Sequence, residues 1–97
     1  MAGFVQIIEF RTSRIDEIRE LAEKWNTGQS GLAVRGTVAS DRDEDNRYFN
    51  IVEFESYEKA MENSGRPETD AFAKKMAELC DGPPTFGNYD LLSEETP

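Results

Sequence analysis

Hydrophobic positions along the chain form short runs with strand spacing, separated by longer stretches with helical spacing. Residues 4–10 and 47–54 are brief runs rich in β-branched and aromatic side chains, which predicts two strands. Residues 32–40 alternate around Val34, Gly36 and Val38, which predicts a third strand. A fourth is expected over residues 85–92, so the pattern predicts a sheet of four strands.

Two stretches between these strands carry apolar residues at intervals of three and four, as amphipathic helices do. The first helix is expected to have Thr12 or Ser13 as its N-cap and to end at Gly28. The second covers residues 57–80 and is expected to be interrupted at residues 63–66, which would divide it into two shorter helices.

The resulting order is β-α-β-β-α-β, which is the order of a ferredoxin-like α+β fold. Right-handed crossovers would place the helices together on one face of a four-stranded antiparallel sheet. A chain of 97 residues is long enough for one domain, which we expect over residues 1–92. Residues 93–97 are expected to form an acidic, flexible tail.

The first and third predicted strands are apolar on both of their faces. In the first strand, Phe4, Ile8 and Phe10 share one face, whereas Val5 and Ile7 share the other. The helices can cover only one face of the sheet, and a second apolar face would be exposed on a monomer. We therefore predict a homodimer in which two open sheets close into one α+β barrel, and a charge at Ile7 or Ile8 is expected to split it.

The net charge of the chain limits the kinds of partner that it can bind. The 20 acidic and 11 basic residues give a formal net charge of −9, which disfavours binding to nucleic acid or to an anionic membrane surface. The N-terminus has no basic segment and the chain has no long apolar run, so neither a signal peptide nor a membrane-spanning helix is expected. These features predict a cytoplasmic protein.

The chain contains no histidine and one cysteine. Histidine is the usual haem ligand, a common zinc ligand and the most frequent general base in enzymes. A single cysteine cannot form an internal disulfide. We therefore expect no metal or other cofactor, and any catalysis must proceed without imidazole.

Three stretches, residues 4–10, 48–54 and 56–61, give the sequence a resemblance to a known family. They resemble the dimeric α+β barrel superfamily, and within it the antibiotic-biosynthesis-monooxygenase-like group, including hypothetical proteins of actinobacterial type. Members of this group include cofactor-free monooxygenases of aromatic polyketides, haem-degrading enzymes, cyclases and isomerases. The resemblance implies a small-molecule pocket for a planar aromatic or otherwise apolar ligand.

Two positions depart from the pattern of that group. Many members carry a histidine about eleven residues after the glutamate at the end of the third strand, and this position is Ser64 here, beside Asn63. This departure argues against haem degradation. Several members also carry a tryptophan just after that glutamate, where this chain has Phe54, which weakens the likeness to the monooxygenases.

The resemblance and the strand pattern together suggest candidate site residues. Trp25 lies on the apolar stripe of the first helix and could form the wall of a pocket, although packing in the core is the alternative. Gln6, Tyr48 and Asn50 have the same strand parity, and buried amides need hydrogen-bond partners that a ligand could supply. The alternative is a hydrogen bond to the backbone or between subunits. We assign catalytic roles to Trp25, Asn50 and Tyr48.

Four further residues are candidates for binding the ligand: Gln6, Arg35, Tyr89 and Phe72. Arg35 could stabilise an enolate-like intermediate and Tyr89 could protonate it, with an ion pair and a packing contact as the alternatives. Glu9 and Glu53 share a strand parity and could raise the pKa of one another, but structural pairing with Arg11, Arg14 or Arg47 is expected.

These observations favour a pocket protein that resembles cofactor-independent monooxygenases of polyketide-like substrates. One alternative is a non-catalytic ligand-binding, structural or accessory dimer. Another is a cyclase-like or isomerase-like enzyme that uses the same pocket with a tyrosine as the acid.

Overall fold

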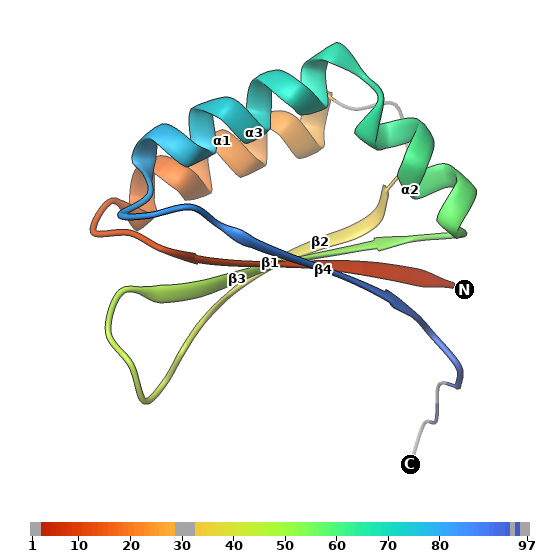
Figure 1. Cartoon of the computed structure of the whole chain (residues 1–97), viewed down its shortest axis with the longest axis horizontal. Helices are drawn as coiled ribbons and strands as arrows, with labels where there is room; N and C mark the ends of the chain where they lie inside the picture. The colour runs from red at the N-terminus through yellow and green to blue at the C-terminus, as the bar shows by residue number, and fades with distance from the viewer. Residues whose placement is uncertain (1–2, 29–32, 94, 96–97) are drawn as a thin grey trace.

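The computed structural model describes residues 3–28, 33–93 and 95, with the backbone alone at residues 25–28. All three helices lie on one face of a twisted four-stranded sheet, and the other face carries no helix (Figure 1). The elements in chain order are β1 (Phe4–Arg11), α1 (Ile15–Gly28), β2 (Ala33–Ser40), β3 (Arg47–Phe54), α2 (Tyr57–Ser64), α3 (Pro67–Leu79) and β4 (Thr85–Asp90).

The strands are arranged in the order β2-β3-β1-β4, and every neighbouring pair is antiparallel. The central strand β1 places Ile8 opposite Asn50 on β3 and opposite Phe86 on β4. This is the predicted ferredoxin-like arrangement. Even-numbered residues of β1 and β3 face the helices, because Ile8 and Phe10 belong to the core that the helices cover.

The first helix begins later than the predicted cap. Ile15 is its first residue, and the Arg14 carbonyl accepts hydrogen bonds from the N–H groups of Glu17 (3.1 Å) and Ile18 (3.2 Å). The Thr12 hydroxyl instead accepts from the Arg14 N–H at 2.9 Å and donates to the Leu79 carbonyl at 2.7 Å. Neither Thr12 nor Ser13 is therefore the N-cap, because the Thr12 hydroxyl joins the end of β1 to the end of α3.

The predicted interruption of the second helix is present but shorter than expected. The Ser56 side chain caps α2 by accepting a hydrogen bond from the Lys59 N–H at 3.2 Å. The break consists of Gly65 and Arg66, so Asn63 and Ser64 remain helical. Arg66 is extended (φ −82°, ψ 139°), as expected for a residue that precedes proline, and Pro67 begins α3.

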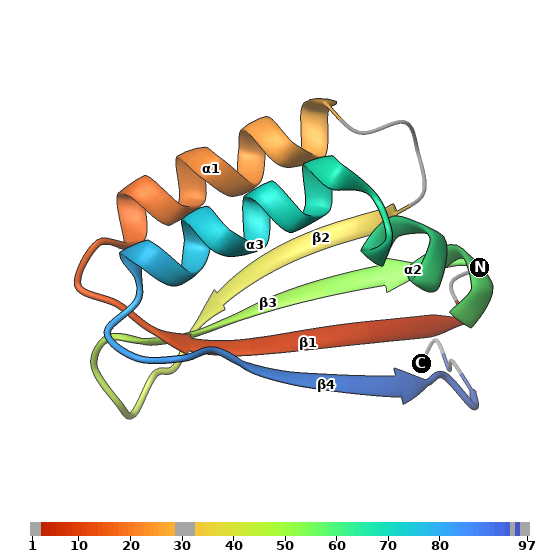
Figure 2. The same ribbon diagram turned by 45° about the horizontal axis from the view of Figure 1, so that its top comes forward.

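The buried core on the helix side forms two separate clusters. Figure 2 shows α1 and α3 side by side over one part of the sheet, with α2 over another part. The first cluster lies under α1 and α3 and consists of Ile8, Phe10, Ile18, Ala22, Phe72 and Met76. The second lies under α2 and consists of Phe4, Val52, Phe54 and Ala60. This division leaves room between the two clusters.

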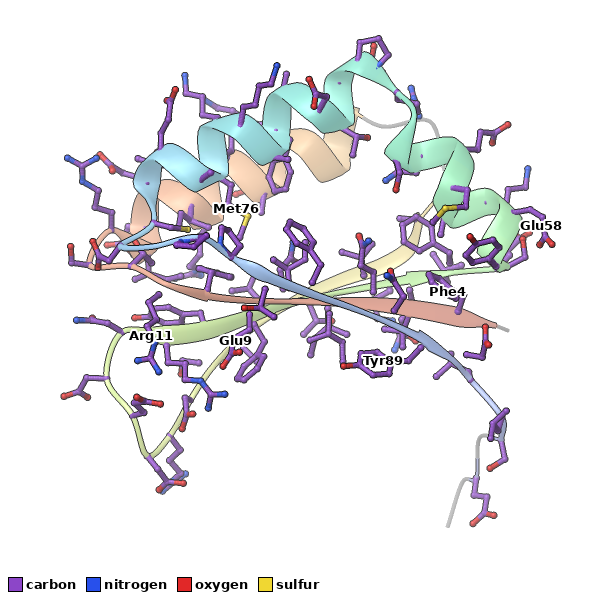
Figure 3. All side chains as sticks on the ribbon, in the orientation of Figure 1. Phe4, Glu9, Arg11, Glu58, Met76 and Tyr89 are labelled. Atoms are coloured by element: carbon purple, nitrogen blue, oxygen red, sulfur yellow. The ribbon has the colours of Figure 1, made fainter. Side chains whose placement is uncertain are left out.

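The opposite face of the sheet is a mixture of apolar residues and ion pairs. Ile7, Phe49 and Ile51 lie half-buried there. Arg47 bonds to Glu9, as the sequence predicts, whereas Glu53 pairs at 3.7 Å with Arg35, which is not among the arginines expected for it. In Figure 3, the side chains of Glu9, Arg11 and Tyr89 extend from this face, away from the helices.

Two details differ from the sequence-based picture. Ile8 is only 6% exposed and packs under the helices, so of the two isoleucines proposed for the dimer test only Ile7 is on the open face. Strand β4 ends at Asp90, two residues earlier than expected, and Leu92 is 93% exposed.

No helix in the described part of the chain is long and apolar enough to span a bilayer.

Candidate functional site

A cavity of about 190 Å³ lies between the sheet and the helices α2 and α3. Its lining comes from β1, β3, α2, α3, the segment before β4 and β4 itself. The lining residues are Gln6, Ile8, Asn50, Val52, Asn63, Ser64, Thr69, Asp70, Phe72, Ala73, Met76, Pro84 and Phe86. Met76 points from α3 toward the sheet in Figure 3.

The position of the cavity follows from the division of the core. Ile8, Phe72 and Met76 belong to the cluster under α1 and α3, whereas Val52 belongs to the cluster under α2. The break before Pro67 separates α2 from α3, so the two helices cover different parts of the sheet. The cavity lies between the two packed regions.

Asn50 is the polar group on the floor of this cavity. It is 6% exposed, and among the residues that the structure describes its side-chain amide makes no hydrogen bond. A buried amide without a partner costs about 1–3 kcal/mol. The Asn50 amide therefore offers a hydrogen-bond donor and a hydrogen-bond acceptor to a ligand in the cavity.

A second amide reaches the cavity from the helical side. Asn63, near the end of α2, is 4% exposed, and its Oδ1 accepts a hydrogen bond from the Thr69 hydroxyl at 3.4 Å. This contact spans the break between α2 and α3. The cavity consequently has polar groups on the sheet side and on the helix side, with apolar walls elsewhere.

The rim of the cavity is more exposed than its floor. Phe86, on the edge strand β4, is 55% exposed. The Gln6 amide donates a hydrogen bond to the Asn88 side-chain oxygen at 3.2 Å. Asp70 is the only ionisable residue in the described lining, and it pairs with Lys74 at 3.1 Å.

The structure brings together three of the residues proposed from the sequence: Gln6, Asn50 and Phe72 all line the cavity. Tyr48 faces the helices but stacks on Phe10 with a ring separation of 5.8 Å, so it is a wall of the core and lies outside the lining. The side chain proposed at Trp25 lies outside the described residues.

Arg35 and Tyr89 lie on the other side of the sheet. Arg35 is opposite Glu53 and pairs with it, and Tyr89 is 52% exposed, opposite Val5. The structure therefore separates these two residues from Gln6, Asn50 and Phe72 by the thickness of the sheet. Figure 3 shows Tyr89 on the side of the sheet away from the helices.

Sequence reasoning missed several lining residues, notably Asn63, Thr69, Met76 and Phe86. One signal was present, because Ser64 lines the cavity and occupies the position at which many members of the group that the sequence resembles carry a histidine. Asn63 and Thr69 could not be identified in this way, since their approach depends on the angle between two helices.

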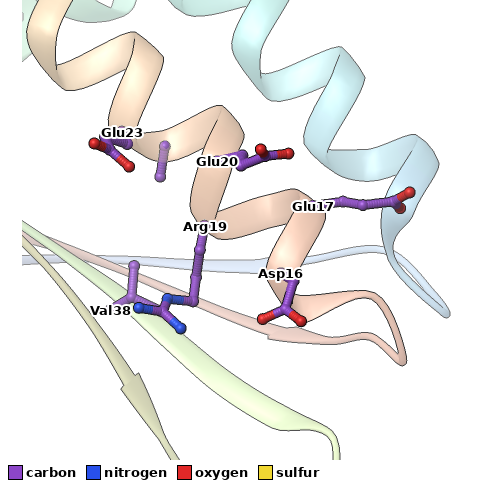
Figure 4. Close-up of a pocket in the computed structure, with 7 residues that line it drawn as sticks. Asp16, Glu17, Arg19, Glu20, Glu23 and Val38 are labelled. Carbon is purple, nitrogen blue, oxygen red and sulfur yellow. The ribbon is translucent and has the colours of Figure 1, made fainter.

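A wider hollow of about 650 Å³ lies between α1 and the edge strand β2. Figure 4 shows Arg19 beside Val38 in this hollow, with acidic side chains of α1 around them. These acidic residues are Asp16, Glu17, Glu20 and Glu23. In the described part of the chain, no three residues that could ligate a metal lie together.

No protein-family model matches the sequence, and no curated protein sequence is significantly similar to it. Several solved structures do resemble it. SnoaB, a cofactor-independent oxygenase from Streptomyces nogalater, is similar with a TM-score of 0.78 and 17% identity, over 99% of this chain and 97% of that one.

Two further structures give the same TM-score of 0.78. One is a protein from Deinococcus radiodurans assigned as an antibiotic biosynthesis monooxygenase, with 10% identity over 96% of each chain. The other is a conserved protein from Methanosarcina mazei Go1, with 10% identity over 92% of each chain. At these identities the likeness is one of fold. The chain therefore has the ferredoxin-like fold of the antibiotic-biosynthesis-monooxygenase-like proteins, which confirms the subunit fold that the sequence predicted.

Proposed function

We propose that this protein binds a planar aromatic small molecule, of the polyketide-like kind, and oxidises it with dioxygen without a metal or an organic cofactor. The observation that carries the proposal is Asn50, a buried amide without a protein partner that lines an apolar cavity. The structural likeness to SnoaB, a cofactor-independent oxygenase, supports it. A cytoplasmic location remains part of the proposal.

The chemistry requires little from the protein. An electron-rich phenolate can itself reduce dioxygen, so that one oxygen atom enters the ring to give a quinone and the other leaves as water. The protein needs to orient the ring and to stabilise the phenolate oxygen while the charge is present. The Asn50 amide N–H is suited to that role, because it is buried and its position is set by the sheet.

Asn63 is proposed as a second positioning residue. Its oxygen accepts from the Thr69 hydroxyl, and its amide NH₂ group has both donors left for a ligand. Phe72 and Met76 supply apolar surface for the ring. The phenolic proton would leave at the rim, where the lining is exposed and where Asp70 lies.

The alternative is a binding protein without catalysis. The buried part of the lining that the structure describes offers amides and apolar side chains, and such a surface can hold a ligand without reacting with it. Oxygen consumption in the presence of a bound phenol separates the two functions, because only the oxygenase consumes dioxygen in proportion to the ligand converted.

Asn50→Leu provides the test of the proposed function. Leucine fills a similar volume without a polar group, so the variant should lose phenol-dependent oxygen uptake by at least tenfold. Because the unpartnered amide is removed, its free energy of unfolding should rise by about 1 kcal/mol. Urea unfolding and an oxygen electrode measure the two effects.

A variant that retains its oxygen uptake would overturn the role of Asn50. A variant that is less stable than the unmutated protein would show that the amide is satisfied in the folded state. Lys75→Leu, at an exposed position of α3 outside the lining, is the control and should change neither quantity appreciably.

We also propose that two copies form a homodimer through the open face of the sheet. Ile7, Phe49 and Ile51 are half-buried on this face, and none of the helices that the structure describes covers it. A two-fold partner presents the same surface and covers these side chains reciprocally. In this arrangement the cavity of each subunit lies on the side of the sheet away from the interface.

A further inference from the structure

We infer that the cavity accepts ligands of one ring or two fused rings and rejects larger ones, and that the side chains of α3 set this limit. The inference rests on the proposed function, because it specifies the class of aromatic molecule that the same cavity takes. It concerns the size of the cavity and the small residue at its rim, Ala73.

The volume of the cavity is the first argument. At about 190 Å³ it is somewhat larger than an apolar protein cavity of about 150 Å³ that holds a benzene molecule. Pockets for drug-sized ligands begin at about 300 Å³. A single ring with its substituents fits the space, and a second fused ring can extend toward the exposed rim, whereas a third has no room.

The rigidity of the floor is the second argument. Ile8, Val52 and Met76 are 6%, 2% and 2% exposed, so each is held on several sides by the two core clusters. Close-packed residues of this kind cannot move far to enlarge a cavity without a loss of stability. The cavity can therefore grow only toward its rim, where Ala73 and Phe86 are exposed.

The position of the polar groups is the third argument. Asn50 is buried on the floor, so a ligand must carry a hydrogen-bonding oxygen at the end that enters first. The rim is flanked by Phe86, whose ring can stack on the part of the ligand that extends outward. This arrangement suits a phenol or naphthol that enters with its hydroxyl group toward β3.

A series of three phenols tests the inference by calorimetry under nitrogen, where no oxidation occurs. The probes are phenol, 2-naphthol and 2-hydroxyanthracene. We expect 2-naphthol to bind the unmutated protein at least tenfold more tightly than 2-hydroxyanthracene. Binding of 2-hydroxyanthracene as tightly as 2-naphthol would overturn the size limit and would leave the proposed function intact. Failure of all three probes to bind would overturn both.

Two alanines on α3 give a matched pair of variants. Ala73 lines the cavity, whereas Ala77, four residues later on the same helix, is also exposed but lies outside the lining. Ala73→Leu should weaken 2-naphthol binding at least tenfold and leave phenol binding nearly unchanged. Ala77→Leu should leave both unchanged. Equal effects of the two variants would show that Ala73 does not limit the cavity.

Met76→Ala tests the opposite change. Removal of the thioether group enlarges the cavity, so 2-hydroxyanthracene should gain at least tenfold in affinity. Because Met76 is 2% exposed, this variant is expected to be less stable, and its far-ultraviolet circular dichroism is recorded first. If it does not fold, the comparison of Ala73→Leu with Ala77→Leu decides the inference alone.

Discussion

Asn50 occupies a position where an aliphatic residue would make a better-packed core. Its neighbours in the chain, Phe49 and Ile51, point to the other face of the sheet, and Ile8 lies opposite it on β1. The sequence shows the interruption of an apolar run, and it shows that Asn50 shares a face with Gln6 and Tyr48. It does not show which face, because both faces of β3 are apolar.

Asp41 is a second residue whose surroundings have a measurable consequence. Its Oδ1 accepts hydrogen bonds from the backbone N–H groups of Asp43 (2.8 Å) and Glu44 (3.2 Å), and its Oδ2 accepts one from Arg47 (2.6 Å). The Asp43 N–H first, and the Arg47 guanidinium second, lower the pKa of the Asp41 carboxyl. The ionised form is therefore favoured in the folded protein.

Because the folded pKa is lowered, the ionised Asp41 stabilises the protein above the ordinary pKa of about 3.9. This stabilisation is lost as the pH falls through the lowered folded value. Asp41→Asn should thus be less stable than the unmutated protein at pH 7, and this difference in the free energy of unfolding should disappear once the pH falls below the lowered folded pKa. Urea unfolding across this range measures it.

The matched control is Asp43→Asn, which removes a neighbouring charge from the same exposed loop. At pH 7 its free energy of unfolding should differ less from that of the unmutated protein than the value for Asp41→Asn does. A difference between Asp41→Asn and the unmutated protein that stays constant from pH 7 to pH 2 would contradict the assignment.

At the scale of elements, a buried hydroxyl joins the end of β1 to the end of α3, beside a backbone hydrogen bond from the Asp81 N–H to the Arg11 carbonyl at 2.7 Å. Thr12 is fully buried and donates to the Leu79 carbonyl, which belongs to the last residue of α3. The same oxygen accepts from the Arg14 N–H just before α1. One side chain thus connects the turn between β1 and α1 to the end of α3, 67 residues away in the sequence.

Thr12→Val keeps the shape of the side chain but removes the hydroxyl, so a buried carbonyl and a backbone N–H lose their partner. The free energy of unfolding should fall by about 1–3 kcal/mol. Thr12→Ser keeps the hydroxyl and loses only a methyl group, and it should be the milder change. Thermal or urea unfolding measures both. A serine variant less stable than the valine variant would indicate that packing is the dominant contribution of Thr12.

Strand and helix positions follow from local periodicity, and the break before Pro67 follows from the chemistry of proline. The start of α1 was placed wrongly, because the Thr12 hydroxyl bonds to Leu79, 67 residues away, and no local pattern contains that contact. The lining residues Asn63 and Phe86 were missed for the same reason, since only the packed helices and strands bring them together.

At the scale of the whole molecule, the arrangement of helices on one face leaves the other face of the sheet for assembly. We expect Ile7→Lys to convert the proposed homodimer into monomers, because a two-fold axis would bury two lysines in an apolar interface. Sedimentation velocity measures the change.

Ala77→Lys, on an exposed position of α3, is the control and should leave the dimer intact. An unmutated protein that sediments as a folded monomer would refute the proposed barrel. Ile8→Lys does not test it, because Ile8 is buried under the helices and its replacement would unfold the subunit.

The alternation of side chains along β1 and β3 has an evolutionary consequence. Gln6, Ile8 and Asn50 belong to the cavity, whereas their immediate neighbours Ile7 and Ile51 belong to the proposed interface. Adjacent residues are therefore under different selective constraints, one from ligand binding and one from assembly. A lineage can change its ligand through the even positions while the odd positions preserve assembly, so one inherited scaffold can diversify its chemistry without first losing its quaternary structure.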